Sequence, residues 1–164
     1  MVVLGVDPGT AITGYGVVAE EEGNLRMVAA GVVTTPAGQL LECRLQAIYR
    51  GLRAVAAEYH PVSAAVEKLF FSRNVRTAMS VGHARGVSLL ALADAGVPLS
   101  EYSPSEIKQA VAGYGGADKQ QVQQMVKTLL GLTEVPQPDD CADALAVAIC
   151  HLHWARWHTI VDQA

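Results

Sequence analysis

The sequence predicts an α/β fold in which helices flank a five-stranded mixed sheet, and three observations support this. Apolar, β-branched runs alternate with helical patterns along most of the chain. The first three predicted strands are joined by short turns, as antiparallel strands are, whereas the later ones are separated by helices, as parallel strands require. Hydrophobic residues make up 51% of the 164 residues, enough to fill a core. We expect one domain over residues 1–157 and a short C-terminal tail over 158–164.

The first three strands form a meander. Residues 2–6 are a short apolar run that stops at Asp7-Pro8-Gly9, a sequence typical of a turn. Residues 13–20 and 25–35 flank the turn at 21–24, which predicts a hairpin.

Helices and strands alternate after the meander. Apolar residues at helical spacing predict a helix over about 38–59 that ends before Pro61. The further predicted elements are a strand over 63–67, a helix over about 74–95, a strand over 97–102, and helices from Pro104, from Asp118 to Leu130, and over about 139–157. The order βββαβαβααα is the layout of ribonuclease-H-like folds, which alone predicts no activity.

The charge distribution gives a first indication of function. The net charge of −4 taken alone argues against a nucleic-acid partner. The charges are uneven, however: residues 68–127 carry 7 basic and 4 acidic side chains, whereas 1–67 carry 4 and 7, and 128–164 carry 1 and 5. A basic middle between acidic ends suits a phosphate-binding surface beside carboxylates, although a chance distribution can also produce it.

Cysteines and apolar runs bear on the cellular compartment. Cys43, Cys141 and Cys150 are odd in number and include no C-x-x-C pair, which argues against a disulfide framework or a structural zinc site. The apolar runs fall far short of the roughly 20 residues of a membrane span, and the N-terminus lacks the basic region of a signal peptide. We therefore expect a cytoplasmic protein.

Four carboxylates are the candidate site. Asp7 and Glu67 end the first and fourth predicted strands, and functional groups gather beyond the carboxyl ends of strands in such sheets. Asp140 and Asp143 are three apart at the start of the last helix, so they share one face. Each acid has an ordinary alternative role. Asp7 would be a turn residue, Glu67 an exposed residue at the end of a strand, and Asp140 a helix N-cap with Asp143 as its capping partner.

Together the four acids favour a metal site. Clustered carboxylates repel one another and raise one another's pKa values unless a cation lies among them. Oxygen ligands select Mg²⁺, or Mn²⁺, over softer metals. Two such ions about 4 Å apart can activate water and stabilise a leaving oxygen, which is the chemistry of phosphodiester hydrolysis.

Several motifs in order along the chain match one family. They are Asp7-Pro8-Gly9-Thr10, Thr13-Gly14-Tyr15-Gly16, Val66-Glu67 with Phe70, Ala84-Arg85-Gly86, Lys108-Gln109, Gly113 through Lys119, and Ala142-Asp143-Ala144-Leu145. From residue 2 to about 153 the sequence resembles the RuvC family of Holliday junction resolvases.

The resemblance implies a metal-dependent endonuclease that resolves four-way DNA junctions in recombination and repair. It implies that Asp7, Glu67, Asp140 and Asp143 bind the catalytic metals, taken as two Mg²⁺ ions per site. It further implies a homodimer whose two sites nick opposing strands symmetrically, and cooperation with the branch-migration helicase.

Five further residues are candidate DNA contacts. The family places phosphate contacts at Lys108 and Lys119 and a base-stacking aromatic at Phe70, and Arg73 and Arg76 follow Glu67 closely enough to contact phosphates. The alternatives are ordinary surface charge and, for Phe70, a core position. The pair His151 and His153 could assist a metal or activate water, but surface positions on the helix are the preferred interpretation.

Two other classes of protein remain alternatives. The sugar-kinase and actin superfamily shares this fold and a similar glycine pattern near Asp7, but it needs two such domains, and no Walker-type stretch is present. A junction-binding module without catalysis would gain nothing from acids beside phosphate.

Overall fold

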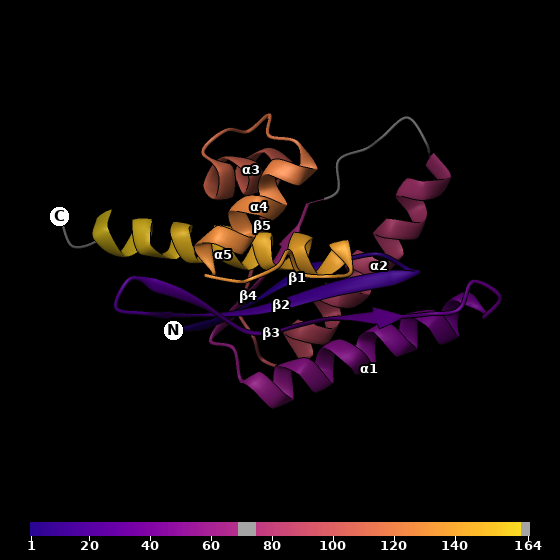
Figure 1. The fold of residues 1–164 in the computed structure, drawn as a ribbon. Helices are drawn as coiled ribbons and strands as arrows, with labels where there is room; N and C mark the ends of the chain where they lie inside the picture. The colour runs from indigo at the N-terminus through magenta and orange to yellow at the C-terminus, as the bar shows by residue number, and fades with distance from the viewer. Residues whose placement is uncertain (69–74, 162–164) are drawn as a thin grey trace.

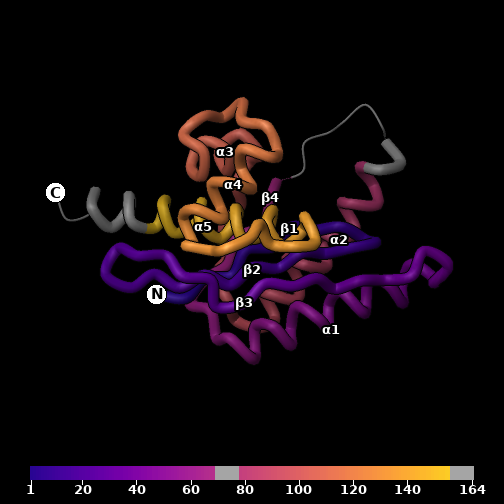
Figure 2. The backbone as a smooth tube through the Cα atoms, viewed as in Figure 1, coloured from indigo at the N-terminus to yellow at the C-terminus, as the bar shows by residue number. Residues whose placement is uncertain are grey.

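The computed structural model describes the backbone of residues 1–68 and 75–161 and the side chains of 1–68 and 78–155. All the predicted elements are present in this part of the chain, whose backbone Figure 2 traces. The strands are β1 (Val2–Asp7), β2 (Ile12–Glu21), β3 (Asn24–Thr34), β4 (Ser63–Glu67) and β5 (Leu99–Tyr102). The helices are α1 (Leu41–Tyr59), α2 (Val75–Asp94), α3 (Pro104–Ala112), α4 (Lys119–Leu129) and α5 (Asp139–Val161).

Most element boundaries differ from the prediction by a residue or less, and three differ by more: the starts of α1 and β5 and the end of α5. α1 begins at Leu41 rather than at about residue 38. β5 begins at Leu99 rather than at residue 97, because the Val97 amide closes the end of α2 by donating to the Leu92 carbonyl. α5 continues to Val161 instead of ending at 157. That residues 1–157 form one domain with a separate tail stays a prediction. No helix in the described part of the chain is long and apolar enough to cross a bilayer.

The sheet is mixed, with strand order β3-β2-β1-β4-β5. β2 is antiparallel to both β1 and β3, whereas β4 is parallel to β1 and to β5. This arrangement confirms the predicted meander followed by crossover connections. Since Val6 pairs with Val66, the residues that follow them, Asp7 and Glu67, leave the sheet on neighbouring parallel strands at the same edge.

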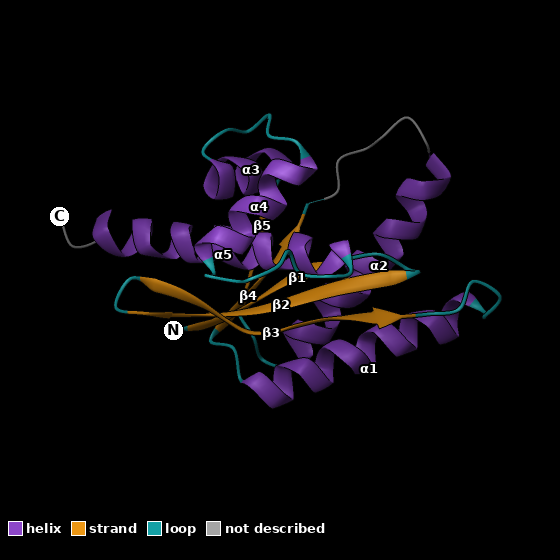
Figure 3. Cartoon of the chain, viewed as in Figure 1, coloured by secondary structure: helices purple, strands orange, loops and turns teal. Residues whose placement is uncertain are grey.

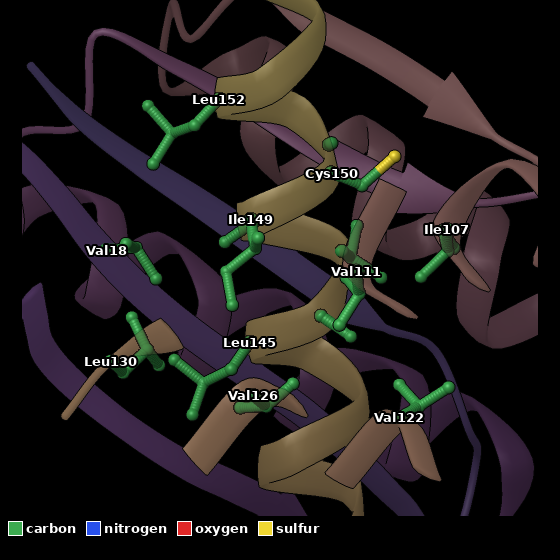
Figure 4. Packing of buried hydrophobic residues seen from close by; sticks show 14 of the residues in the cluster. Val18, Ile107, Val111, Val122, Val126, Leu130, Leu145, Ile149, Cys150 and Leu152 are labelled. Carbon is green, nitrogen blue, oxygen red and sulfur yellow. The ribbon is translucent and has the colours of Figure 1, made fainter. Parts of the chain in front are cut away.

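Helices cover both faces of the sheet (Figures 1 and 3): α1 and α2 lie on one face, and α5 with α3 and α4 lies on the other. Alternate strand residues fill the two resulting cores. Leu4 and Val17 pack with α1 and α2, whereas Val3 and Val18 belong to the core with α3, α4 and α5. Figure 4 shows the second core, in which Leu145 and Ile149 of α5 lie among side chains of the sheet and the small helices.

Two glycines of β2 let the backbone of α5 lie directly on the sheet. A Cβ built on Gly14 would stand 2.2 Å from the Asp140 carbonyl oxygen, and one on Gly16 would stand 2.7 Å from the Leu145 amide nitrogen. Real atoms do not approach so closely, so larger residues would push α5 away. Because Gly14 also pairs with Asp7 across the strands, the close contact brings the start of α5 to the end of β1.

Candidate active site

The four predicted carboxylates come from three elements that meet at one edge of the sheet. Asp7 ends β1 and Glu67 ends β4, so the strand backbones fix their positions. Asp140 and Asp143 lie in the first turns of α5, on the part of the helix that Gly14 holds against β2. α5 begins at Asp139, so Asp140 is inside the helix, and the alternative that made it the N-cap is wrong.

The electrostatics show that these side chains lie within range of one another. Burial, followed by the charges of Glu67, Asp143 and Asp140, raises the pKa of Asp7 to about 7, against an opposing effect of Lys119. Burial and the charge of Asp143 raise the pKa of Glu67, and burial raises that of Asp143 despite its contact with Lys119. Burial and the neighbouring carboxylates thus both disfavour the charged forms of these acids when no cation is bound.

Two lysines supply the nearby positive charge. Lys119 Nζ lies 3.1 Å from Asp143 Oδ2 and 3.2 Å from Asp139 Oδ2. Lys108 is close enough to Glu67 to oppose the rise in its pKa. Both lysines line a cavity of about 210 Å³ together with Glu67 and Asp143. The cavity is thus a site of mixed charge at the edge of the sheet.

The position of Lys119 is fixed by the start of α4. Asp118 is the N-cap of this helix, as predicted: its carboxylate accepts from the Gln121 amide at 2.9 Å, and the Gln121 side chain accepts from the Asp118 amide at 2.9 Å. This reciprocal pair satisfies two amides that the helix cannot, so the first turn is well anchored. Lys119, the next residue, is held beside the acids.

The donor chemistry of the cluster fits a hard divalent cation. In this conformation no three acidic, histidine or cysteine side chains of the described residues converge closely enough to hold a metal ion. The four acids nevertheless provide only oxygen donors, and the raised pKa of Asp7 shows that negative charge is left without sufficient compensation. A hard cation with oxygen ligands would supply that compensation.

The predicted DNA contacts are only partly described by the structure. Lys108 and Lys119 lie at the cavity beside the acids. Phe70 and Arg73 lie outside the described residues. Arg76 lies in the first turn of α2, and its side chain is likewise outside the description. These five contacts therefore stay predictions.

The preferred interpretation of His151 as a surface residue is wrong. His151 is buried, and its two ring nitrogens are hydrogen-bonded to the Tyr102 hydroxyl at 3.0 Å and the Ser63 hydroxyl at 2.8 Å. His153 is half-buried and its Nδ1 donates to the Ala110 carbonyl at 3.0 Å. Both rings therefore have structural partners.

Sequence reasoning missed the roles of two residues. Asp139 had no predicted role, yet it is the second partner of Lys119, and this contact lowers the pKa of Asp139. Gly14 was noticed only as part of a motif, although it allows α5 to approach. Its signal was available, because a glycine inside a strand often marks close approach of another backbone.

Comparisons with known proteins show similarity to one family over most of the chain. A family model described as crossover junction endodeoxyribonuclease RuvC matches residues 3–151. The crossover junction endodeoxyribonuclease RuvC of Chloroflexus aggregans is 59% identical over 155 residues, which are 94% of each chain. That of Heliobacterium modesticaldum is 58% identical over 157 residues, covering 96% of this chain and 97% of its own.

A solved structure is similar over nearly the whole chain. It is the Thermus thermophilus RuvC in complex with a Holliday junction substrate, with a TM-score of 0.91, 41% identity and 97% coverage of both chains. This similarity confirms the predicted ribonuclease-H-like fold class.

Proposed function

The chain belongs to the RuvC family of crossover junction endodeoxyribonucleases, and we propose that Asp7, Glu67, Asp140 and Asp143 form its catalytic centre for cutting four-way DNA junctions. The observation that carries this proposal is the convergence of the ends of β1 and β4 with the start of α5, which brings the four acids to one edge of the sheet. Burial and the charges of the other three acids raise the pKa of Asp7 there to about 7. Such crowding costs folding free energy. A bound cation would offset this cost.

The enzyme class is metal-dependent, and we propose that the four acids hold Mg²⁺, with Mn²⁺ as the alternative, in a two-ion arrangement. Bound there, such ions activate a water molecule and stabilise the leaving oxygen of a phosphodiester. The chain itself orients the ligands: β1 and β4 fix Asp7 and Glu67, and the close contact at Gly14 fixes the start of α5. Rigid elements suit a site that must hold its ligands to a fraction of an ångström.

Four-way junction DNA is the proposed substrate. The Thermus thermophilus relative is described in complex with a Holliday junction substrate, and its similarity spans nearly all of both chains. Lys108 and Lys119 beside the acids can neutralise backbone phosphates. We also retain base stacking by Phe70 and phosphate contacts by Arg73 and Arg76 as proposals.

Symmetric cutting of two strands requires two sites, and an exposed stripe on α2 supports a homodimer. The stripe consists of Met79, His83, Gly86, Leu90 and Ala93, all exposed and separated alternately by four and three residues. This is the spacing of residues that meet in helix pairs. Nothing lies within 4 Å of a Cβ built on Gly86, so a second helix can approach closely there. We propose that α2 pairs with α2 of a second chain.

The dimer is tested by Leu90→Glu, whose side chain is 54% exposed in the single chain. Sedimentation should show a dimer for the wild type and a monomer for the variant, because a charge in the centre of the stripe opposes helix pairing. Val62→Glu is the matched control, since Val62 is 57% exposed and lies outside the stripe. A wild-type monomer, or a Leu90→Glu dimer as stable as the control, contradicts this pairing.

Two finer statements stay predictions. Cooperation with the branch-migration helicase is tested by a pull-down with the purified helicase. A cytoplasmic location is tested by fractionation of cells.

The proposed function is tested by offering the protein a labelled four-way junction, a matched duplex and ATP, with Mg²⁺ or with chelator. We expect paired nicks in the junction with Mg²⁺ alone, and no ATP hydrolysis. Asp7→Asn should abolish cutting while junction binding persists, because it removes a ligand and leaves the lysines in place. ATP hydrolysis without nicked strands, or cutting that survives in Asp7→Asn, would contradict the proposal.

A further inference from the structure

The Lys119 ammonium supplies positive charge beside the acids, as a bound metal ion would. Its ammonium lies 3.1 Å from Asp143 and 3.2 Å from Asp139, so it contacts one proposed ligand and one acid outside the proposed set. Partial burial lowers the pKa of Lys119, but its hydrogen bonds to Asp143 and Asp139 outweigh this effect and raise the pKa above the ordinary lysine value. The ammonium is therefore charged and held in place by two carboxylates.

The same contact occupies one oxygen of a proposed metal ligand. Asp143 Oδ2 accepts from Lys119 Nζ, so a cation bound by this oxygen would have to take the place of the ammonium. While the ion pair persists, the described acids do not converge closely enough to hold a metal ion. Metal binding and the Lys119 contact thus compete for one carboxylate.

Lys108 provides an internal comparison. It lines the same cavity and opposes the rise in the pKa of Glu67, but the salt bridges found among the described residues do not include it. The two lysines therefore add similar charge to the site, and only Lys119 is directly paired with an acid of the proposed centre.

We propose that Lys119 is the internal counter-ion of the metal-free site. A divalent cation must displace the Lys119 ammonium from Asp143, and the released ammonium then pairs with a DNA phosphate. This inference rests on the proposed function, because it assigns Asp143 as a ligand. Each of the two incoming groups takes one partner of the ion pair, the cation taking the carboxylate and the phosphate taking the ammonium. Metal and junction should consequently strengthen each other's binding, and the coupling must be equal in both directions.

The test measures metal binding without DNA, by Mn²⁺ titration followed through the electron paramagnetic resonance signal of the free ion. Lys119→Met should bind Mn²⁺ at least fivefold more tightly than Lys108→Met, although both variants lose one positive charge from the cavity. Lys119→Arg should bind Mn²⁺ as the wild type does, because arginine can keep the ion pair. Equal affinities of the two methionine variants, or weaker binding by Lys119→Met, would overturn the inference.

A second measurement tests the coupling. Junction affinity is compared in chelator and in Ca²⁺, another hard cation with oxygen ligands, while strand cutting is followed in the same samples. Ca²⁺ should strengthen junction binding by the wild type severalfold more than by Lys119→Met. An equal effect on both proteins would overturn the inference.

Failure of the proposed function has a different signature. If the wild type binds no Mn²⁺, or if Asp143→Asn binds it as tightly as the wild type does, Asp143 is not a ligand and the catalytic centre itself is misassigned. If Asp143→Asn loses Mn²⁺ while Lys119→Met matches Lys108→Met, the centre stands and only the role of Lys119 is lost.

Discussion

Ionisable side chains at the two ends of the described part of α5 lie in opposite environments. At the first turns, Asp140 and Asp143 face Asp7 and Glu67, and the crowding contributes to raising the pKa of Asp7 to about 7. Three turns later, burial lowers the pKa of His151 and keeps the ring neutral, and both of its nitrogens have hydroxyl partners. One end carries unbalanced charge, and the other carries a fully satisfied polar group.

The difference indicates where the molecule gives up stability for function. A satisfied buried network stabilises a fold, whereas like charges that lack partners destabilise it. A cation bound among the acids would offset this cost, as expected of a site that works with a ligand. Predictions that separate activity from stability at the two ends test this interpretation.

The largest expected effect is on catalysis at the acidic end. Asp143→Asn should lower the single-turnover rate of junction cutting on the order of a thousandfold or more, because it removes a proposed metal ligand. Glu134→Gln is the control, since this exposed acid precedes α5 and lies outside the cluster. Similar cutting rates of Asp143→Asn and the control would contradict a catalytic role of the acids at the start of α5.

Gly14→Ala should damage both stability and cutting. The new Cβ would collide with the Asp140 carbonyl, which forces α5 away from β2 and displaces its acids. We expect a loss of about 3 kcal/mol in the free energy of unfolding, measured by denaturant titration. Gly38→Ala is the matched control, because nothing lies within 4 Å of a Cβ built there. If Gly14→Ala unfolds and cuts like Gly38→Ala, α5 does not depend on this contact.

At the histidine end, only stability should change. His151→Phe replaces the imidazole with a somewhat larger apolar ring and removes the hydrogen bonds to Tyr102 and Ser63, at a cost of about 2 kcal/mol. Mn²⁺ affinity and the cutting rate per folded molecule should stay at wild-type values. A variant of normal stability with lost metal binding would instead connect His151 to the site.

Most of the fold was predictable because its signals are local. Turn chemistry at Asp7-Pro8-Gly9 predicted where β1 ends, and Pro61 predicted the end of α1 at Tyr59; the structure confirms both. The end of α5 was set too early, since no glycine or proline follows Trp157 to stop the helix. Val97 was assigned to a strand, because composition does not reveal the hydrogen bond from its amide to the Leu92 carbonyl that closes α2.

The positions of the four acids were predictable from the sequence, whereas their contacts were not. Strand ends and helical spacing located Asp7, Glu67, Asp140 and Asp143, because each position follows from a single element. The pairing of Lys119 with Asp143 joins two helices, and no spacing along the chain encodes it. The burial of His151 had a readable signal, since apolar residues surround most of α5 and a helix that is apolar all round is buried.

The unfavourable burial and crowding of Asp7 are tested most directly by the free energy of unfolding of Asp7→Asn and of the wild type, measured in chelator from pH 4 to 8. With a pKa raised from 3.8 to about 7, the folded protein holds the Asp7 proton more tightly than the unfolded chain. Stability of the metal-free wild type should fall as the pH rises through this range, while the variant lacks this loss.

Asp7→Asn should therefore become the more stable protein as the pH rises, by about 4 kcal/mol at pH 8, since each pKa unit corresponds to roughly 1.4 kcal/mol. A stability difference that is independent of pH, or that favours the wild type at pH 8, would contradict the unfavourable burial and crowding of Asp7.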